Sequence, residues 1–76
     1  MNHQDILEGL GFNLEQRNDS AGWERWRHKL APKHDQDFAL IVYNDYDMDD
    51  TMEIAANMLR KIGQYQKIQQ LTQYID

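Results

Sequence analysis

Residues 38–62 read FALIVYNDYDMDDTMEIAANMLRKI, and this stretch contains the change of pattern that decides the fold. Residues 38–43 are apolar at every position, which is typical of a strand that is central in a sheet or covered on its second face. From Met48 onward the apolar residues recur in steps of four and three, the spacing of a helix that is buried on one side. A buried strand followed directly by a long amphipathic helix predicts an α+β protein.

The first turn of this long helix is acidic, which suits the positive end of a helix dipole. Two capping boxes fit the start equally well, one made by Asp50 with Glu53 and the other by Asp47 with Asp50. The beginning of the helix is therefore predicted only to within one turn.

Three shorter segments precede this stretch. Residues 2–10 place apolar side chains at helical spacing after a capping residue, Asn2, which predicts a helix of about two turns. Residues 12–17 and 23–30 alternate apolar and polar side chains as half-buried strands do, and the polar turn at 18–22 joins them into a hairpin. The predicted order is a short N-terminal helix, a three-stranded antiparallel meander and a long C-terminal helix.

Alternation along the strands also predicts which side chains face the two helices. The expected inner face consists of Phe12, Leu14, Trp26, Leu30, Phe38, Leu40 and Val42. The expected outer face consists of Asn13, Glu15, Arg17, Trp23, Arg25, Arg27, Lys29, Ala39, Ile41 and Tyr43.

The C-terminal helix contains Gly63, beyond which the apolar positions drift away from the earlier stripe. We therefore expect a kink or a short break near Gly63. Beyond it, Tyr65, Ile68, Leu71 and Ile75 exceed what a three-stranded core needs to cover. We expect this segment to be helical and to serve in self-association, as a homodimer, or in docking to a partner.

Length and composition limit the classes of protein. Seventy-six residues predict one small domain spanning 1–76, because each half of a two-domain chain would be too short to bury a core. The absence of cysteine excludes disulfide and Cys-ligated metal scaffolds. The longest apolar run, residues 38–43, is about a third of a membrane-spanning helix. With no secretory pattern at the start, we expect a cytoplasmic protein that contacts no membrane.

Groups suited to covalent catalysis are sparse. The only serine, Ser20, lies in a predicted turn, and neither Thr51 nor Thr72 has a histidine nearby in the sequence. We therefore expect a protein that is not an enzyme and needs no cofactor.

The candidate metal patterns are incomplete. The stretch that opens at Asp45 imitates an EF-hand loop, but Asp50 stands where glycine is required and Ala56 stands where a glutamate should close the site. Zinc-compatible groups occur at His28, His34, Asp35 and Asp37, at a spacing that does not force them together. We expect no metal site.

Charge is distributed unevenly along the chain, whose net charge is −5. Residues 35–53 carry seven acidic and no basic side chains, whereas residues 23–34 carry a net charge of +3. Carboxylates between the last strand and the long helix would form a ridge spaced like a phosphate backbone, suited to docking on a basic protein or nucleoprotein complex. The candidate partner-binding residues are Asp45, Asp47, Asp49, Asp50 and Glu53. An ordinary solvated loop with a favourable helix start is the alternative interpretation.

A second candidate site lies on the outer face of the sheet, where alternating cations and aromatic rings could contact phosphates and stack on bases. Its residues are Trp23, Arg25, Arg27, Lys29 and Tyr43. The net charge disfavours direct nucleic-acid binding, because an anionic protein repels an anionic polymer at long range.

The order of elements resembles that of double-stranded-RNA-binding domains over essentially the whole chain. Those domains carry lysines at the start of the second helix, where this chain has residues 47–53, which are acidic. The resemblance therefore implies a topology and not RNA binding.

In its size and its aspartate cluster the chain is similar to small phage and mobile-element products that inhibit bacterial defence complexes, the anti-CRISPR proteins among them. That resemblance implies a DNA-mimicking inhibitor of viral origin in the host cytoplasm. Acidic immunity proteins and antitoxins share the same composition.

Overall fold

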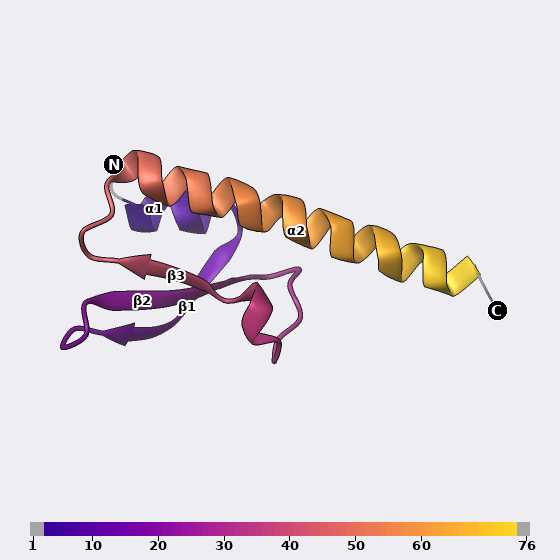
Figure 1. Ribbon diagram of the computed structural model, residues 1–76, viewed down its shortest axis with the longest axis horizontal. Coiled ribbons are helices and arrows are strands. Elements are labelled where there is room, and N and C mark those ends of the chain that lie inside the picture. The colour runs from indigo at the N-terminus through magenta and orange to yellow at the C-terminus, as the bar shows by residue number, and fades with distance from the viewer. Residues whose placement is uncertain (1–2, 75–76) are drawn as a thin grey trace.

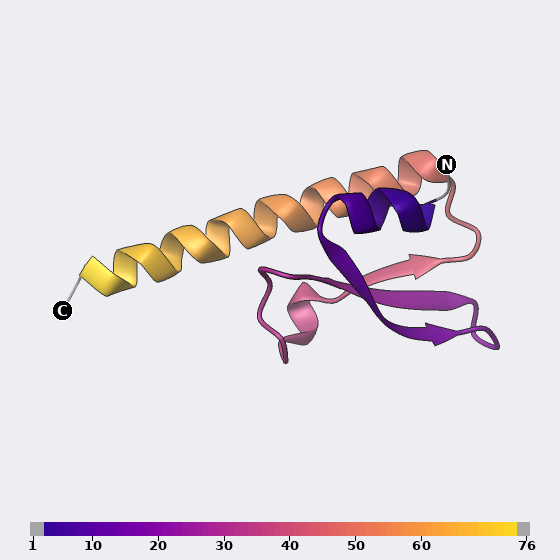
Figure 2. The same ribbon diagram turned by 180° about the vertical axis from the view of Figure 1, so that it is seen from behind.

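The computed structural model describes residues 3–74, with side chains described up to residue 70. Along the chain lie α1 (His3–Gly9), β1 (Phe12–Asn18), β2 (Trp23–His28), the 3-10 helix η1 (Gln36–Phe38), β3 (Leu40–Tyr43) and α2 (Met48–Tyr74). The strands form one antiparallel sheet in the order β1-β2-β3. Both helices lie on the same side of this sheet (Figures 1 and 2). The predicted α+β meander is confirmed, while the predicted cap at Asn2 lies outside the described residues.

The core lies between the sheet and the two helices. Its main part consists of Leu7, Phe12, Trp26, Leu40, Val42 and Ala55, and a smaller part at the end of the sheet consists of Ala31, Phe38 and Ile62. Two members of the predicted inner face are not buried: Leu14 is 39% exposed and Leu30 is 52% exposed. Leu30 lies past the end of β2, which is two residues shorter than predicted.

The segment before β3 also differs from the prediction. Phe38 is buried, but it belongs to η1 and not to the strand. The Asp35 carboxylate caps η1 by accepting a hydrogen bond from the Asp37 N–H at 2.9 Å. An aspartate that bonds the backbone two residues ahead favours a turn over an extended strand. The strand therefore begins at Leu40.

A β-bulge in β1 changes which side chains face the helices. Leu14 lies opposite Trp26, but Gln16 lies opposite Arg25, so Glu15 is an extra residue in the strand. One inserted residue reverses the alternation beyond it. Arg17 consequently lies opposite Glu24 and on its face, and its predicted place on the outer face is wrong.

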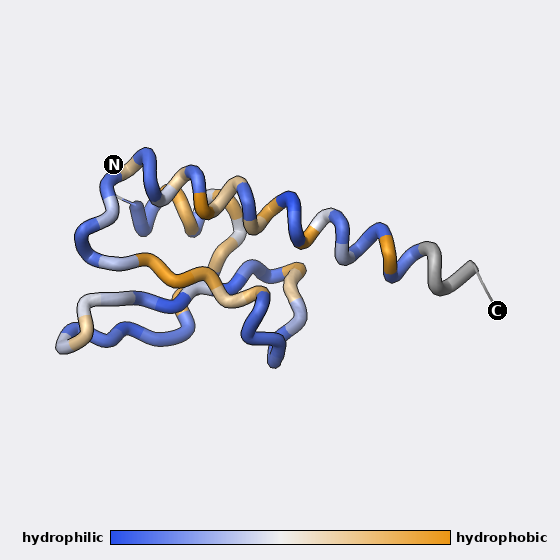
Figure 3. The backbone as a smooth tube through the Cα atoms, viewed as in Figure 1, coloured by the Kyte–Doolittle hydropathy of each residue, from blue (hydrophilic) through white to orange (hydrophobic). Residues whose placement is uncertain are grey.

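Helix α2 continues through Gly63 without interruption, and Figure 1 shows it without a sharp bend, so the predicted kink or break is wrong. Gly63 is exposed, and a Cβ atom there would meet nothing within 4 Å. The cost of a glycine inside a helix, about 1 kcal/mol relative to alanine, is small enough for a long helix to absorb. Apolar residues recur at intervals along α2, as Figure 3 shows.

The C-terminal part of α2 projects beyond the sheet (Figure 1). Ile62 is buried, and the Tyr65 ring packs edge-on against Phe38 with centroids 5.2 Å apart. One turn further on, Ile68 is 63% exposed. The side chain of Leu71 and the whole of Ile75, which the sequence suggests for docking, lie outside the described part. No helix in residues 3–74 is long and apolar enough to cross a membrane.

Candidate protein-binding site

The acidic cluster, which we define as Asp45, Asp47, Asp49, Asp50 and Glu53, lies in the turn after β3 and the first turns of α2. The Asp50 N–H donates to Asp47 Oδ1 at 2.8 Å, and the Asp47 N–H donates to Asp50 Oδ2 at 3.3 Å. These reciprocal bonds form a capping box. Of the two predicted boxes, the structure therefore forms the one that begins at Asp47.

Thr51 completes this helix start. Its hydroxyl donates to the Asp47 carbonyl oxygen at 3.0 Å, and its N–H donates to the same oxygen at 3.1 Å. Thr51 is fully buried, so this hydroxyl bond satisfies a polar group inside the core. Asp47 and Asp50 thus have a structural role in addition to their charge.

The other three carboxylates of the cluster have no polar partner in the described structure. Asp45, Asp49 and Glu53 are exposed, and their side chains form no hydrogen bond or ion pair with any residue between 3 and 70. An open hollow of about 310 Å³ adjoins the cluster and is lined by Tyr46, Asp50, Glu53, Ile54 and Asn57. The cluster is therefore a negatively charged surface with a shallow hollow of mixed polar and apolar lining beside it.

The outer face of the sheet offers fewer free cations than its sequence suggests. Glu15, which the bulge places beside β2, pairs with Arg25 Nε at 3.4 Å and with Arg27 Nε at 3.0 Å. Arg27 Nη1 also donates to the carbonyl oxygens of Pro32 and Asp35, at 2.5 and 2.8 Å. The Arg27 side chain is only 11% exposed, so its charge serves the fold.

The remaining members of the second candidate site are dispersed. Trp23 is half-buried at the start of β2, and Lys29 is exposed in the turn beyond its end. Tyr43 is 44% exposed and packs edge-on against Tyr46, with ring centroids 5.5 Å apart. The described structure therefore leaves no continuous row of free cations beside the exposed aromatic ring.

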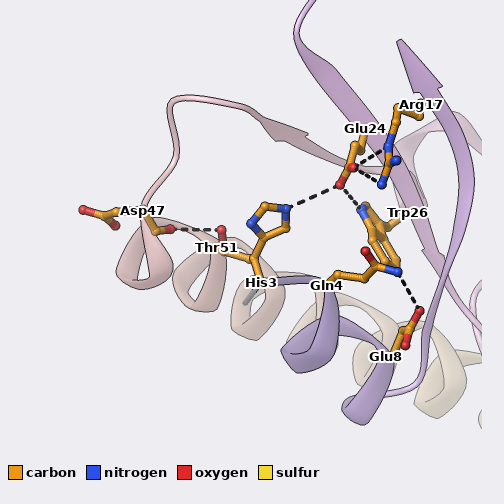
Figure 4. A network of polar contacts seen from close by, with 8 residues as sticks. All are labelled: His3, Gln4, Glu8, Arg17, Glu24, Trp26, Asp47 and Thr51. Carbon is orange, nitrogen blue, oxygen red and sulfur yellow. Dashed lines mark hydrogen bonds and ion pairs between the residues drawn. The ribbon is translucent and has the colours of Figure 1, made fainter. Parts of the chain in front are cut away.

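A polar network around Glu24, which the sequence analysis did not single out, joins α1 to the sheet (Figure 4). Arg17 Nε donates to Glu24 Oε2 at 2.8 Å, and Trp26 Nε1 donates to Oε1 at 3.2 Å. His3 Nε2 lies 3.6 Å from Oε1. Alternation from Trp26 predicts that Glu24 lies on the inner face. The sequence does not predict its pairing with Arg17, because Arg17 reaches that face only through the bulge.

The histidine that shares a strand face with Trp26 is also structural. His28 is 6% exposed, its Nε2 lies 2.9 Å from the Leu10 carbonyl oxygen, and its Nδ1 accepts from the Leu30 N–H. These two bonds occupy both ring nitrogens, with the proton on Nε2. Within residues 3–74, no three His, Asp or Glu side chains are grouped so that they could hold a metal ion.

Comparison of the chain with protein-family models, with curated proteins and with solved structures gives no match. The geometry described above is therefore the basis of the functional argument.

Proposed function

We propose that this chain is a non-enzymatic binding protein that inhibits a nucleic-acid-handling protein by presenting the acidic cluster to its basic surface. The observation that carries the proposal is the exposure of five carboxylates within residues 45–53, none of them ion-paired within the described residues. Such a cluster produces a negative field resembling that of a nucleic-acid backbone. A protein that binds phosphates is attracted to this field for the same reason that it is attracted to DNA.

The charges elsewhere in the molecule support a protein partner over direct nucleic-acid binding. Glu15 forms ion pairs with both Arg25 and Arg27, two of the three cations of the outer-face site, and so reduces their combined charge. The net charge of −5 adds a repulsion that a nucleic acid would have to overcome. DNA-processing proteins of bacterial defence systems are the class of partner that the size and acidity of the chain favour.

The proposal is tested by capture from a bacterial lysate on the immobilised full chain, followed by competition with duplex DNA. The cluster variant Asp45→Asn/Asp49→Asn/Glu53→Gln removes the three carboxylates that the fold does not use. The matched control, Glu8→Gln/Asp19→Asn/Asp37→Asn, removes three exposed carboxylates elsewhere. Both variants change the net charge from −5 to −2.

We expect the wild type and the control variant to retain the same basic nucleic-acid-binding protein, and duplex DNA to release it. The cluster variant should retain much less of it, and the purified wild-type chain should reduce the DNA binding of that protein. Retention that is equal for the two variants, or insensitive to DNA, would contradict the proposal. A captured basic toxin that acts on neither DNA nor RNA would point instead to an immunity protein.

A further inference from the structure

A second hollow lies at the end of the sheet opposite the acidic cluster. It has a volume of about 350 Å³ and is lined by residues of β1, of the end of β2 and of the turn at residues 29–34. The end of β2 and the start of α2 lie at opposite ends of the sheet (Figure 1). Two buried residues, His28 and Ala31, contribute to its lining, and its exposed lining residues include Lys29, Lys33 and His34. The hollow therefore has a buried floor and an exposed rim of basic side chains.

The charges of this rim are not compensated by the rest of the fold. Within residues 3–70, the side chains of Lys29, Lys33 and His34 form no hydrogen bond or ion pair. Glu15 also lines the hollow, but it is held by Arg25 and Arg27. One carboxylate and three cations line the hollow, so its charged side chains sum to a net charge of +2.

The backbone that carries the rim is held in place from several sides. The Lys29 N–H donates to the Gly11 carbonyl oxygen at 3.0 Å, and the Ala31 N–H donates to the His28 carbonyl oxygen at 3.0 Å. Further along, Arg27 Nη1 bonds the carbonyl oxygens of Pro32 and Asp35. A ligand that binds between the rim residues need not first order this turn, which lowers the entropic cost of binding.

We propose that this hollow binds the phosphate group of a small molecule. A phosphate offers several acceptor oxygens and a negative charge, which match the ammonium donors of Lys29 and Lys33 and an N–H of His34. A long nucleic acid fits less well, because its further phosphates would meet the field of a chain whose net charge is −5. The proposal does not depend on the acidic cluster or on the function proposed for it.

The test is a titration of the ¹⁵N-labelled full chain with pyrophosphate at low ionic strength, followed through backbone amide chemical shifts. We expect saturable shifts confined to residues 28–34 and the start of β1, with a dissociation constant of about 1 mM or lower. The variant Lys29→Gln/Lys33→Gln should weaken binding about tenfold or more, because it removes two charge-assisted donors. Both lysines are exposed, so the amide spectrum should otherwise be preserved.

The matched control is Arg60→Gln/Lys67→Gln, which removes two exposed cations from α2 and gives the same net charge of −7. It should bind pyrophosphate as the wild type does. Equal weakening in the two variants would mean that pyrophosphate responds to net charge alone, and this result overturns the proposal. Shifts that do not saturate, or that spread over the whole surface, overturn it as well.

Discussion

At the scale of single residues, Glu24 shows how a carboxylate is accommodated inside a small core. Its side chain is only 12% exposed, and it accepts hydrogen bonds from Arg17 and from the fully buried Trp26. A buried carboxylate that loses its cation retains most of the cost of its desolvation. The pair is therefore expected to behave differently from an exposed ion pair.

Removing the cation alone should be more harmful than removing both charges. We expect Arg17→Met to lower the free energy of unfolding by about 1–2 kcal/mol, because it leaves the Glu24 carboxylate without its positive partner. Adding Glu24→Gln should restore part of this loss, because the amide oxygen still accepts from Trp26 Nε1. Urea denaturation of Arg17→Met, Glu24→Gln and the double variant gives the coupling free energy between the two side chains. Strictly additive losses would show that the pair contributes no more than a surface ion pair.

The misplacement of Arg17 has a physical cause in the pairing of β1 with β2. Regular alternation across Glu15 predicts Arg17 on the outer face, and nothing in the side-chain pattern of β1 marks an inserted residue. A bulge depends on how two strands pair, so it cannot be recognised from the alternation of side chains within one strand. The capping box at Asp47 was predictable as one of two registers, because the sequence places an aspartate at each capping position.

At the scale of elements, the helices and strands were predictable because hydrophobic spacing changes sharply between them. The prediction failed at Gly63, where a general helix breaker was given more weight than the surrounding residues, which favour a helix. In residues 48–62 one side of α2 packs on the core, and this packing outweighs the small local penalty. Phe38 is buried as predicted, but it reaches Ile62 and Tyr65 from η1 and not from the predicted strand.

Two glycine substitutions should therefore have opposite effects. Gly63→Ala is expected to stabilise the protein by about 0.5–1 kcal/mol, because it raises helix propensity where the added methyl group meets nothing within 4 Å. Gly11→Ala should destabilise it, because Gly11 has a φ of 98° and a Cβ there would lie 2.8 Å from His28 Nε2. Thermal unfolding of both variants measures the two effects. A lower melting temperature for Gly63→Ala would indicate a strained or bent helix at this position.

The projecting part of α2 is the element best placed to join two copies of the chain. Ile68 is 63% exposed there, and it lies three residues after Tyr65, whose ring packs against Phe38. We expect the full chain to sediment as a dimer and Ile68→Glu to sediment as a monomer, because a charge in an apolar helix contact is costly to bury. The folded monomer should keep its melting temperature, since Ile68 lies outside the core. A wild type that sediments as a monomer at the highest concentration tested would exclude pairing through this helix.

At the scale of the whole molecule, the fold places the acidic cluster and the basic hollow far apart in space. The molecule is elongated, with extents of 48 × 22 × 15 Å. The connection from β3 to α2, which carries the acidic cluster, and the end of β2, which lines the basic hollow, lie at opposite ends of the sheet (Figure 1). Local cations such as Arg27 are used inside the fold, whereas Asp45, Asp49 and Glu53 are left to solvent. The acidic cluster, with its five carboxylates, is therefore the more strongly charged of the two ends.

The central claim is that these free carboxylates attract a basic partner, and it predicts an effect on the association rate. Long-range attraction acts chiefly on the rate of encounter and is screened by salt. Folding should change little in the cluster variant, because the Asp47–Asp50 capping box remains intact. Each lost interaction with the helix dipole costs only about 0.3–1 kcal/mol.

The most direct test is the association rate constant of the captured partner with the wild type, the cluster variant and the control variant, measured by stopped flow at increasing salt. The account predicts a wild-type rate that falls steeply with salt, and a cluster variant that associates about tenfold more slowly at low salt with a flatter dependence. The control variant should remain close to the wild type. Equal association rates for the cluster and control variants across the salt range would contradict the role of the acidic cluster.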